Sequence, residues 1–266
     1  MKLGTGQRIS QLASLIVAFI GFTGIGATHI MFPGIHCAAC PWVVYLCPIG
    51  VMQGAVISGT VPYALLIYLL GFGISVGRAW CGWVCPFGLF QDLINVRRGR
   101  EWKRKLRITG KLLYLKFLVL ALTILAAWYF ADKLFCLYIC PIITLEATIP
   151  LLPWTLEVNL EVISRLIIFV LVVVGVVITG RFWCRVLCPL GAIFGCFNKV
   201  AFLQIRSYPE KCIKGCVLCT RACPSRFRVP GAIKEGRLDN LECVRCGRCI
   251  DVCPRKALRF EFAGRG

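Results

Sequence analysis

Cys243–Pro254 reads CVRCGRCIDVCP, and this stretch decides what kind of chain carries it. Its cysteines follow the bacterial ferredoxin spacing, C-x2-C-x2-C-x3-C-P. An earlier stretch, Cys212–Pro224 or CIKGCVLCTRACP, repeats the pattern with one extra residue in its first gap. Such close spacing suits thiolate ligands of iron and gives poor geometry for disulfides between near neighbours. We predict two 4Fe–4S clusters here, with a pair of zinc sites as the alternative.

The ligands of each cluster come from both stretches, because in two-cluster ferredoxins the fourth cysteine of one run ligates the other cluster. One predicted set is Cys212, Cys216, Cys219 and Cys253, and the other is Cys243, Cys246, Cys249 and Cys223. The apolar stretches FLQIRS and ALRFEF should pair as strands of a small α+β domain over residues 203–266. Positive neighbours favour the reduced, more anionic state of a cluster; here they are Lys211, Lys214, Arg221, Arg245, Arg248, Arg255 and Lys256.

The chain as a whole is both strongly apolar and strongly basic. Hydrophobic residues make up 58% of the 266 residues, yet the net charge is +19. This combination argues against a disordered chain and against a simple nucleic-acid binder, and it favours an integral membrane protein. Four windows approach the ~20 residues that cross a hydrocarbon core; they are about Ile9–Met31, Val61–Val76, Leu112–Phe130 and Val162–Thr179.

Charge predicts the orientation of these windows. Seven Lys and Arg residues lie within 97–107, between the second and third windows. The positive-inside rule puts that loop in the cytoplasm. The sequence therefore predicts a multi-pass protein of a prokaryotic cytoplasmic membrane, with its N- and C-termini and its cysteine-rich tail on the cytoplasmic side.

The apolar part also repeats itself. GRAWCGWVCPFG (Gly77–Gly88) matches GRFWCRVLCPLG (Gly180–Gly191), and VVYLCPI (Val43–Ile49) matches CLYICPI (Cys136–Ile142). Two halves facing each other would bring equivalent cysteines together near a pseudo-twofold axis.

We predict an all-α membrane bundle of about four spans over residues 1–200, with repeats at about 9–95 and 108–198. The segments 41–59 and 141–154, in which Glu146 is the only charged residue, should be re-entrant, because they are too apolar to be solvated loops.

Each repeat supplies a Cys-x-x-x-Cys-Pro motif, and its proline suits the first position of a helix. A thiol there faces the positive end of the helix dipole, which favours the thiolate. Arg78 and Arg181 precede the motifs and add positive charge. We predict that an inner group can ligate a third cluster, with buried structural cysteines as the alternative; the group is Cys81, Cys85, Cys184 and Cys188.

Five further cysteines are predicted to form an outer group: Cys37, Cys40, Cys47, Cys136 and Cys140. An outer 4Fe–4S cluster would let electrons cross the membrane in short hops, and a Cys37–Cys40 disulfide is the alternative. We expect no haem, because no C-x-x-C-H motif occurs. We also expect no flavin and no NAD site, because the glycine-rich GFGISVG lacks the strand–helix setting of a dinucleotide site.

The order span, GRxWCxxxCPxG, span, GRxWCxxxCPxG and two-cluster tail resembles the NapH type of ferredoxin-like membrane quinol dehydrogenase subunits. The same core occurs in NosR-type and CcoG-type proteins. The resemblance covers nearly the whole chain, and the outer group departs from the NapH pattern. It implies an electron-transfer subunit of an oxidoreductase complex, in contact with membrane lipid, quinone or quinol, and other redox subunits that are ferredoxin-type or act on the outer side.

A quinone site would need a proton acceptor nearby. His29, His36 and Glu146 are the candidates, because they are ionisable groups close to apolar segments. Two other functions stay open. One is a transmembrane thiol–disulfide relay. The other is a metal (copper) reductase or assembly factor, as the resemblance to CcoG-type proteins allows.

Overall fold

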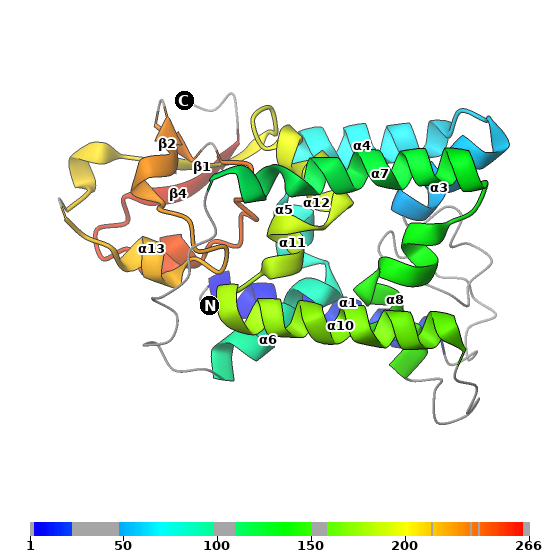
Figure 1. Cartoon of the computed structure of the whole chain (residues 1–266). Helices are drawn as coiled ribbons and strands as arrows, with labels where there is room; N and C mark the ends of the chain where they lie inside the picture. Colours follow the sequence, from blue (N-terminus) through cyan, green and yellow to red (C-terminus); the bar gives the residue numbers. More distant parts are fainter. Residues whose placement is uncertain are drawn as a thin grey trace.

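The computed structural model describes residues 3–22, 48–97, 110–149, 159–213, 215–234, 236–238 and 240–262. A helical part and a smaller, sheet-containing tail lie side by side (Figure 1). The helical elements, in which η marks 3-10 or π turns, are α1 (Leu3–Phe22), α3 (Pro48–Ser58), α4 (Tyr63–Val76), α5 (Ala79–Trp83), α6 (Pro86–Arg97), η2 (Gly110–Tyr114), α7 (Leu115–Phe130), η3 (Phe135–Ile139), α8 (Pro141–Ile143), η4 (Thr144–Thr148), α10 (Leu160–Thr179), α11 (Phe182–Val186) and α12 (Pro189–Phe197).

Two of the four predicted windows are helices long and apolar enough to cross a membrane. Leu112–Phe130 has a mean hydropathy of 2.0 and Leu160–Thr179 one of 2.9, and most of each helix is not buried inside the protein. The second window forms only the 14-residue α4. The first window begins within α1, and its part beyond Phe22 lies outside the described residues.

The two Cys-x-x-x-Cys-Pro motifs adopt the same order of elements. In each, a long helix ends at a glycine with positive φ, 55° at Gly77 and 94° at Gly180. A five-residue helix follows, and the next helix begins at the motif proline, Pro86 or Pro189. The predicted helix starts are therefore confirmed. Proline suits this position because the first turn leaves backbone N–H groups unpaired in any case.

Large aromatic side chains fill the centre of the helical part. Trp183 is 2% exposed and lies edge-on to Phe87, with 6.5 Å between ring centroids. Phe135 stacks on the same indole at 6.2 Å. The tryptophan of the second motif thus packs on residues from the first repeat and from η3, which holds the motif loops against each other.

The tail is built on a four-stranded sheet with the order β2-β3-β1-β4. The stretches FLQIRS and ALRFEF pair as predicted. Their strands run antiparallel, with Leu203 opposite Phe262 and Ser207 opposite Leu258. A short hairpin that the sequence analysis did not predict adds the other two strands. The tail elements are β1 (Leu203–Ser207), η5 (Pro209–Lys211), α13 (Leu218–Ala222), η6 (Pro230–Ala232), β2 (Ile233–Lys234), β3 (Arg237–Leu238), α14 (Arg248–Asp251) and β4 (Leu258–Phe262).

The beginning of α1 lies against the tail. The backbone N–H groups of Leu3 and Gly4 donate to the Asp251 carboxylate at 2.9 and 2.6 Å. A carboxylate beside the first turn of a helix satisfies amides that the helix leaves free. This contact fixes the N-terminal helix to α14, which carries one of the predicted iron ligands.

Candidate iron–sulfur sites

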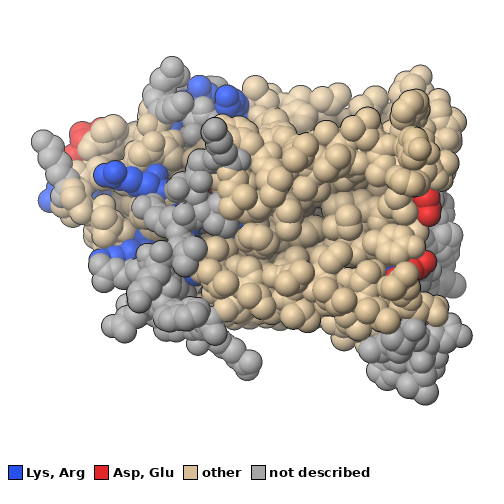
Figure 2. Space-filling view, in the orientation of Figure 1, with Lys and Arg blue, Asp and Glu red and all other residues tan. Residues whose placement is uncertain are grey.

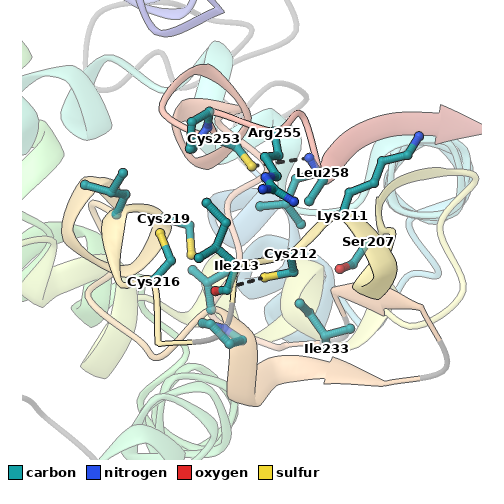
Figure 3. Close-up of a pocket in the computed structure, with 15 residues that line it drawn as sticks. Ser207, Lys211, Cys212, Ile213, Cys216, Cys219, Ile233, Cys253, Arg255 and Leu258 are labelled. Atoms are coloured by element: carbon teal, nitrogen blue, oxygen red, sulfur yellow. Dashed lines mark hydrogen bonds between the residues drawn. The ribbon is translucent and has the colours of Figure 1, made fainter.

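A cavity in the tail is lined by four cysteines, which we call the distal set: Cys212, Cys216, Cys219 and Cys253. Figure 3 shows their thiols around the cavity, with Ile213 and Leu258 among the apolar residues beside them. The set joins the first cysteine run to the last cysteine of the second run. It is the same group that the ferredoxin spacing assigns to one cluster.

A second cavity of the tail is lined by the docked set: Cys223, Cys243, Cys246 and Cys249. Gly247 has a φ of 75°, so the chain can turn sharply between two of these cysteines. Burial raises the pKa of Cys223 to about 12 and that of Cys243 to about 11. Free thiols here are neutral at physiological pH, and metal ligation is what would deprotonate them.

A third cavity lies among the helices and is lined by six cysteines: Cys81, Cys85, Cys136, Cys140, Cys184 and Cys188. The structure thus brings the inner group together and adds two members of the predicted outer group to it. Cys37, Cys40 and Cys47 lie outside the described residues. Apart from Arg78 and backbone atoms, the other residues that line this six-cysteine cavity are apolar, including Trp80, Phe87 and Phe135.

Buried amides hydrogen-bond to thiols around this cavity. Gln91 is fully buried and its Nε2 donates to Cys184 Sγ at 3.0 Å. The Cys136 thiol donates to Gln53 Oε1 at 3.1 Å, and Gln53 is 1% exposed. Hydrogen bonds to ligand sulfurs are one of the ways in which a protein tunes a cluster. The sequence analysis missed Gln91, which lies six residues after Cys85 on a helix that also holds Asp92 and Asn95.

The described residues bury more positive than negative charge. The buried cations are Arg78, Lys116, Arg181, Arg185 and Arg245, against the two buried carboxylates Asp92 and Glu242. Burying a charge is costly unless it is paired. Among the described residues, the buried cations therefore outnumber the buried carboxylates by three.

The two buried carboxylates lie where the motif loops meet the tail. Asp92 accepts from Arg181 at 2.8 and 2.9 Å and from Arg248 at 2.5 Å. Burial by itself raises the pKa of Asp92, but these two guanidinium groups outweigh it, and the pKa is lowered. Glu242 pairs with Lys116, and with Arg78 at 3.5 Å.

The loop of the docked set packs directly on the first motif. Trp83 Nε1 donates to the carbonyl of Arg245 at 3.0 Å. Gly82 lies so close to the carbonyl oxygen of Val244 that any Cβ at residue 82 would collide with it. Arg245 in turn donates to the carbonyls of Val76 and Asn198, at 3.1 and 2.7 Å. Because these bonds anchor it, Arg245 is not the solvated basic neighbour that its sequence position suggests.

Across the described residues, no three His, Cys, Asp or Glu side chains converge closely enough to hold a single metal ion. The thiols surround cavities instead, as the ligands of a larger polynuclear cluster must. Of the other predicted residues, His29 and His36 lie outside the described residues, and the side chain of Glu146 is not described.

Models of known protein families match the parts of the chain that carry these cysteines. A model of a "4Fe-4S binding domain" matches residues 58–105, 115–150 and 162–207, and one of a "4Fe-4S dicluster domain" matches residues 211–258. An uncharacterized protein of Methanocaldococcus jannaschii is 31% identical over 82% of this chain and 87% of its own length. The ferredoxin-type protein NapH of Haemophilus influenzae is 25% identical, over 73% and 66%. The methylamine utilization ferredoxin-type protein MauN of Methylorubrum extorquens is 27% identical, over 80% and 72%. No solved structure matches significantly.

The fold and the cysteine-lined cavities therefore define an iron–sulfur protein of the ferredoxin type, with 4Fe–4S clusters as its cofactors and electron transfer as its role. The chain belongs to the NapH-type family of ferredoxin-type proteins.

Proposed function

We propose that the chain is a multi-pass membrane protein that carries electrons between the quinone pool, or an outer redox partner, and 4Fe–4S clusters in a cytoplasmic tail. The observation that carries the proposal is the succession of three cysteine-lined cavities. The docked and distal sets lie on neighbouring helices, because α13 carries Cys219 of the distal set and α14, which it contacts, carries Cys249 of the docked set. Arg78 of the six-cysteine cavity donates to the carbonyl of Leu241, close to the docked set. When bound, a 4Fe–4S cluster supplies one-electron transfer.

The ligands proposed for the tail clusters are the distal and docked sets. In the six-cysteine cavity, we propose Cys81, Cys85, Cys184 and Cys188 as ligands of a third cluster, because each motif contributes two thiols and a Pro-initiated helix. The aromatic lining would keep water away from these thiols. Low solvent exposure is one of the factors that set the potential of such a site.

The buried charge supports this fit. A 4Fe–4S cluster with four thiolates is an anion and would offset the excess of buried cations. Arg78 lines the six-cysteine cavity and its Nε has no hydrogen-bond partner among the described residues. Nη1 of Arg181 is also unpartnered there, although Arg181 is fully buried. Two such donors near Cys184 suit an anionic occupant.

The distribution of surface charge supports the membrane placement. Figure 2 shows an uncharged band over the helices, with basic residues over the tail and acidic residues at the opposite end. Apolar side chains on the long helices are exposed, among them Ile67 at 73%, Leu122 at 54% and Leu171 at 62%. Side chains of this kind are stable in contact with lipid. Positive charge at the tail end favours a cytoplasmic tail.

The proposal of a quinone partner is based on the resemblance to NapH-type subunits and not on a pocket. Among the described residues, Gln53 accepts a hydrogen bond from Cys136, which lines the six-cysteine cavity. Glu146 is the repeat equivalent of Gln53, and we propose it, with His29 and His36, for proton transfer at the outer side.

A thiol–disulfide relay is the second candidate function. It is favoured by the two thiols in the six-cysteine cavity that a four-ligand cluster does not need, Cys136 and Cys140. A relay would leave these cysteines free of iron and reactive toward alkylating reagents after reduction.

Iron and acid-labile sulfide per chain, with low-temperature EPR after reduction, test the proposal on anaerobically purified protein. Each cluster contributes about four irons, so we expect about twelve with three clusters and about eight with the tail clusters alone. Cys188→Ala should remove about four irons and one EPR signal. The control Cys196→Ala, at an exposed cysteine that lines none of the three cavities, should change neither.

About eight irons in the wild-type protein and no loss in Cys188→Ala would overturn the third cluster and favour the relay. Fewer than about eight would overturn the tail assignment as well.

A further inference from the structure

The two cysteine sets of the tail differ in what covers them. The docked set lies against the helical part through Trp83 and Gly82, and three of its four cysteines are buried. The distal set lies beyond it, and its Cys212 is exposed while the other three are half-buried. A protein partner can therefore approach the distal set, but the helices and the rest of the tail cover the docked set.

The surface around the distal set is apolar with a basic rim. Ile213, Val217 and Leu218 are exposed by 44, 47 and 43%, although all three are hydrophobic. Ile213 and Leu218 line the same cavity as the cysteines. Exposed Lys211 and Arg255 line the same cavity, as Figure 3 shows, and exposed Arg221 lies one helical turn from Leu218 on α13. We call these six residues the distal surface. Glu210 is the only acidic residue between Pro209 and Cys223.

Lipid headgroups would also attract such a rim. The position in the molecule argues against them, because the tail that carries α13 lies beyond the ends of the long helices α4, α7 and α10 (Figure 1). A protein in solution can reach the tail there, whereas a membrane would surround the long helices themselves.

We propose that the distal surface binds a small acidic electron-carrier protein, and this inference rests on the proposed function. Carboxylates of the carrier would meet the three basic residues, and a small apolar contact would form on the three hydrophobic ones. Opposite charges speed and orient the encounter of two proteins, while a small interface keeps it transient. Such an arrangement suits a partner that must leave after each exchange.

The test measures binding rather than activity. The full chain is placed in nanodiscs of phosphatidylcholine and titrated with a small acidic [2Fe–2S] ferredoxin in its oxidised state, by calorimetry at low and moderate salt. Arg255→Glu and Arg221→Glu should each weaken binding by roughly tenfold, and salt should weaken the wild-type complex. Val217→Ser should weaken binding without changing the charge. The matched control Lys199→Glu reverses an exposed cation outside the distal surface and should bind like the wild type.

Iron content is measured on every variant, so that loss of a cluster is not mistaken for loss of docking. Normal iron with equal affinities for Arg255→Glu and Lys199→Glu would overturn the proposal and leave the proposed function intact. Titration with phosphatidylserine vesicles gives the other contrary outcome. If the two reversals weaken vesicle binding and not ferredoxin binding, the distal surface is a lipid contact.

Discussion

Arg181 donates two hydrogen bonds to Asp92, at 2.8 Å from Nε to Oδ1 and 2.9 Å from Nη2 to Oδ2. Both side chains are almost completely buried. The pair joins the second motif to the helix that follows the first, and Arg248 of the tail donates to the same carboxylate. One carboxylate therefore ties together three segments that are distant in the sequence.

Asp92→Asn should lower the free energy of unfolding by roughly 3–5 kcal/mol, because it leaves a buried guanidinium without its charge partner. Thermal unfolding in detergent, followed by circular dichroism, measures the loss. The control is Glu161→Gln, which breaks an ion pair with Arg165 in which the Glu161 side chain is 45% exposed. That change should cost less than ~1 kcal/mol. Similar losses in the two variants would contradict the role given to Asp92.

Gly82→Ala should separate the tail from the first motif, because the new methyl group meets the Val244 carbonyl. Overpacking of this kind costs about 1–3 kcal/mol. Limited proteolysis of the tail and the thermal midpoint are the measurements. Gly71→Ala is the matched control, since a Cβ there has no neighbour within 4 Å, and the change should be neutral or slightly stabilising. A fully docked, equally stable Gly82→Ala protein would show that the close contact does not exist.

The raised thiol pKa values in the tail predict how iron-free protein reacts. Cys223 and Cys243, with pKa values of about 12 and 11, should resist iodoacetamide at pH 8 and react as the pH approaches those values. The fold favours their neutral form, so this contribution to stability is present below the unfolded pKa of about 8.5 and is lost as pH rises toward 11–12. Mass spectrometry after labelling, with a urea-unfolded sample as control, measures the effect. Rapid labelling at pH 8 without urea would refute it.

Gln91→Leu should lower the reduction potential of the cluster proposed for the six-cysteine cavity. The amide donates to Cys184 Sγ, and a hydrogen bond to a ligand sulfur favours the more negative, reduced state. EPR-monitored redox titration measures the shift. Gln204→Leu is a control of the same chemistry, because Gln204 is buried and its amide donates to the Ala201 carbonyl. An unchanged potential in Gln91→Leu would show that this amide does not tune the site.

Most of the features that the sequence could predict follow from the spacing of residues that are close together in the chain. The ferredoxin rule that exchanges the fourth cysteine leads to the same two sets that line the tail cavities, with Cys253 beside Cys212 and Cys223 beside Cys243. The pairing of β1 with β4 and the helix starts at Pro86 and Pro189 also follow from residues close together in the chain.

Contacts between distant segments could not be predicted in the same way. Asp92 lies 89 residues from Arg181 and 156 from Arg248, and no periodicity links them. Cys136 was expected on the outer side, apart from the inner group. It lies at the six-cysteine cavity because η3 packs against α10, bringing Phe135 onto Trp183. The β2–β3 hairpin has only two residues in each strand, too few for an alternating pattern.

The close approach of Gly82 to Val244 also bears on the order of assembly. Once the loop of the docked set lies against the first motif, three of its four thiols are buried. We expect the maturation machinery to load that set before the tail settles on the helices. The thiols of the distal set are exposed or half-buried in the folded protein, so we expect that set to accept iron after the tail has docked.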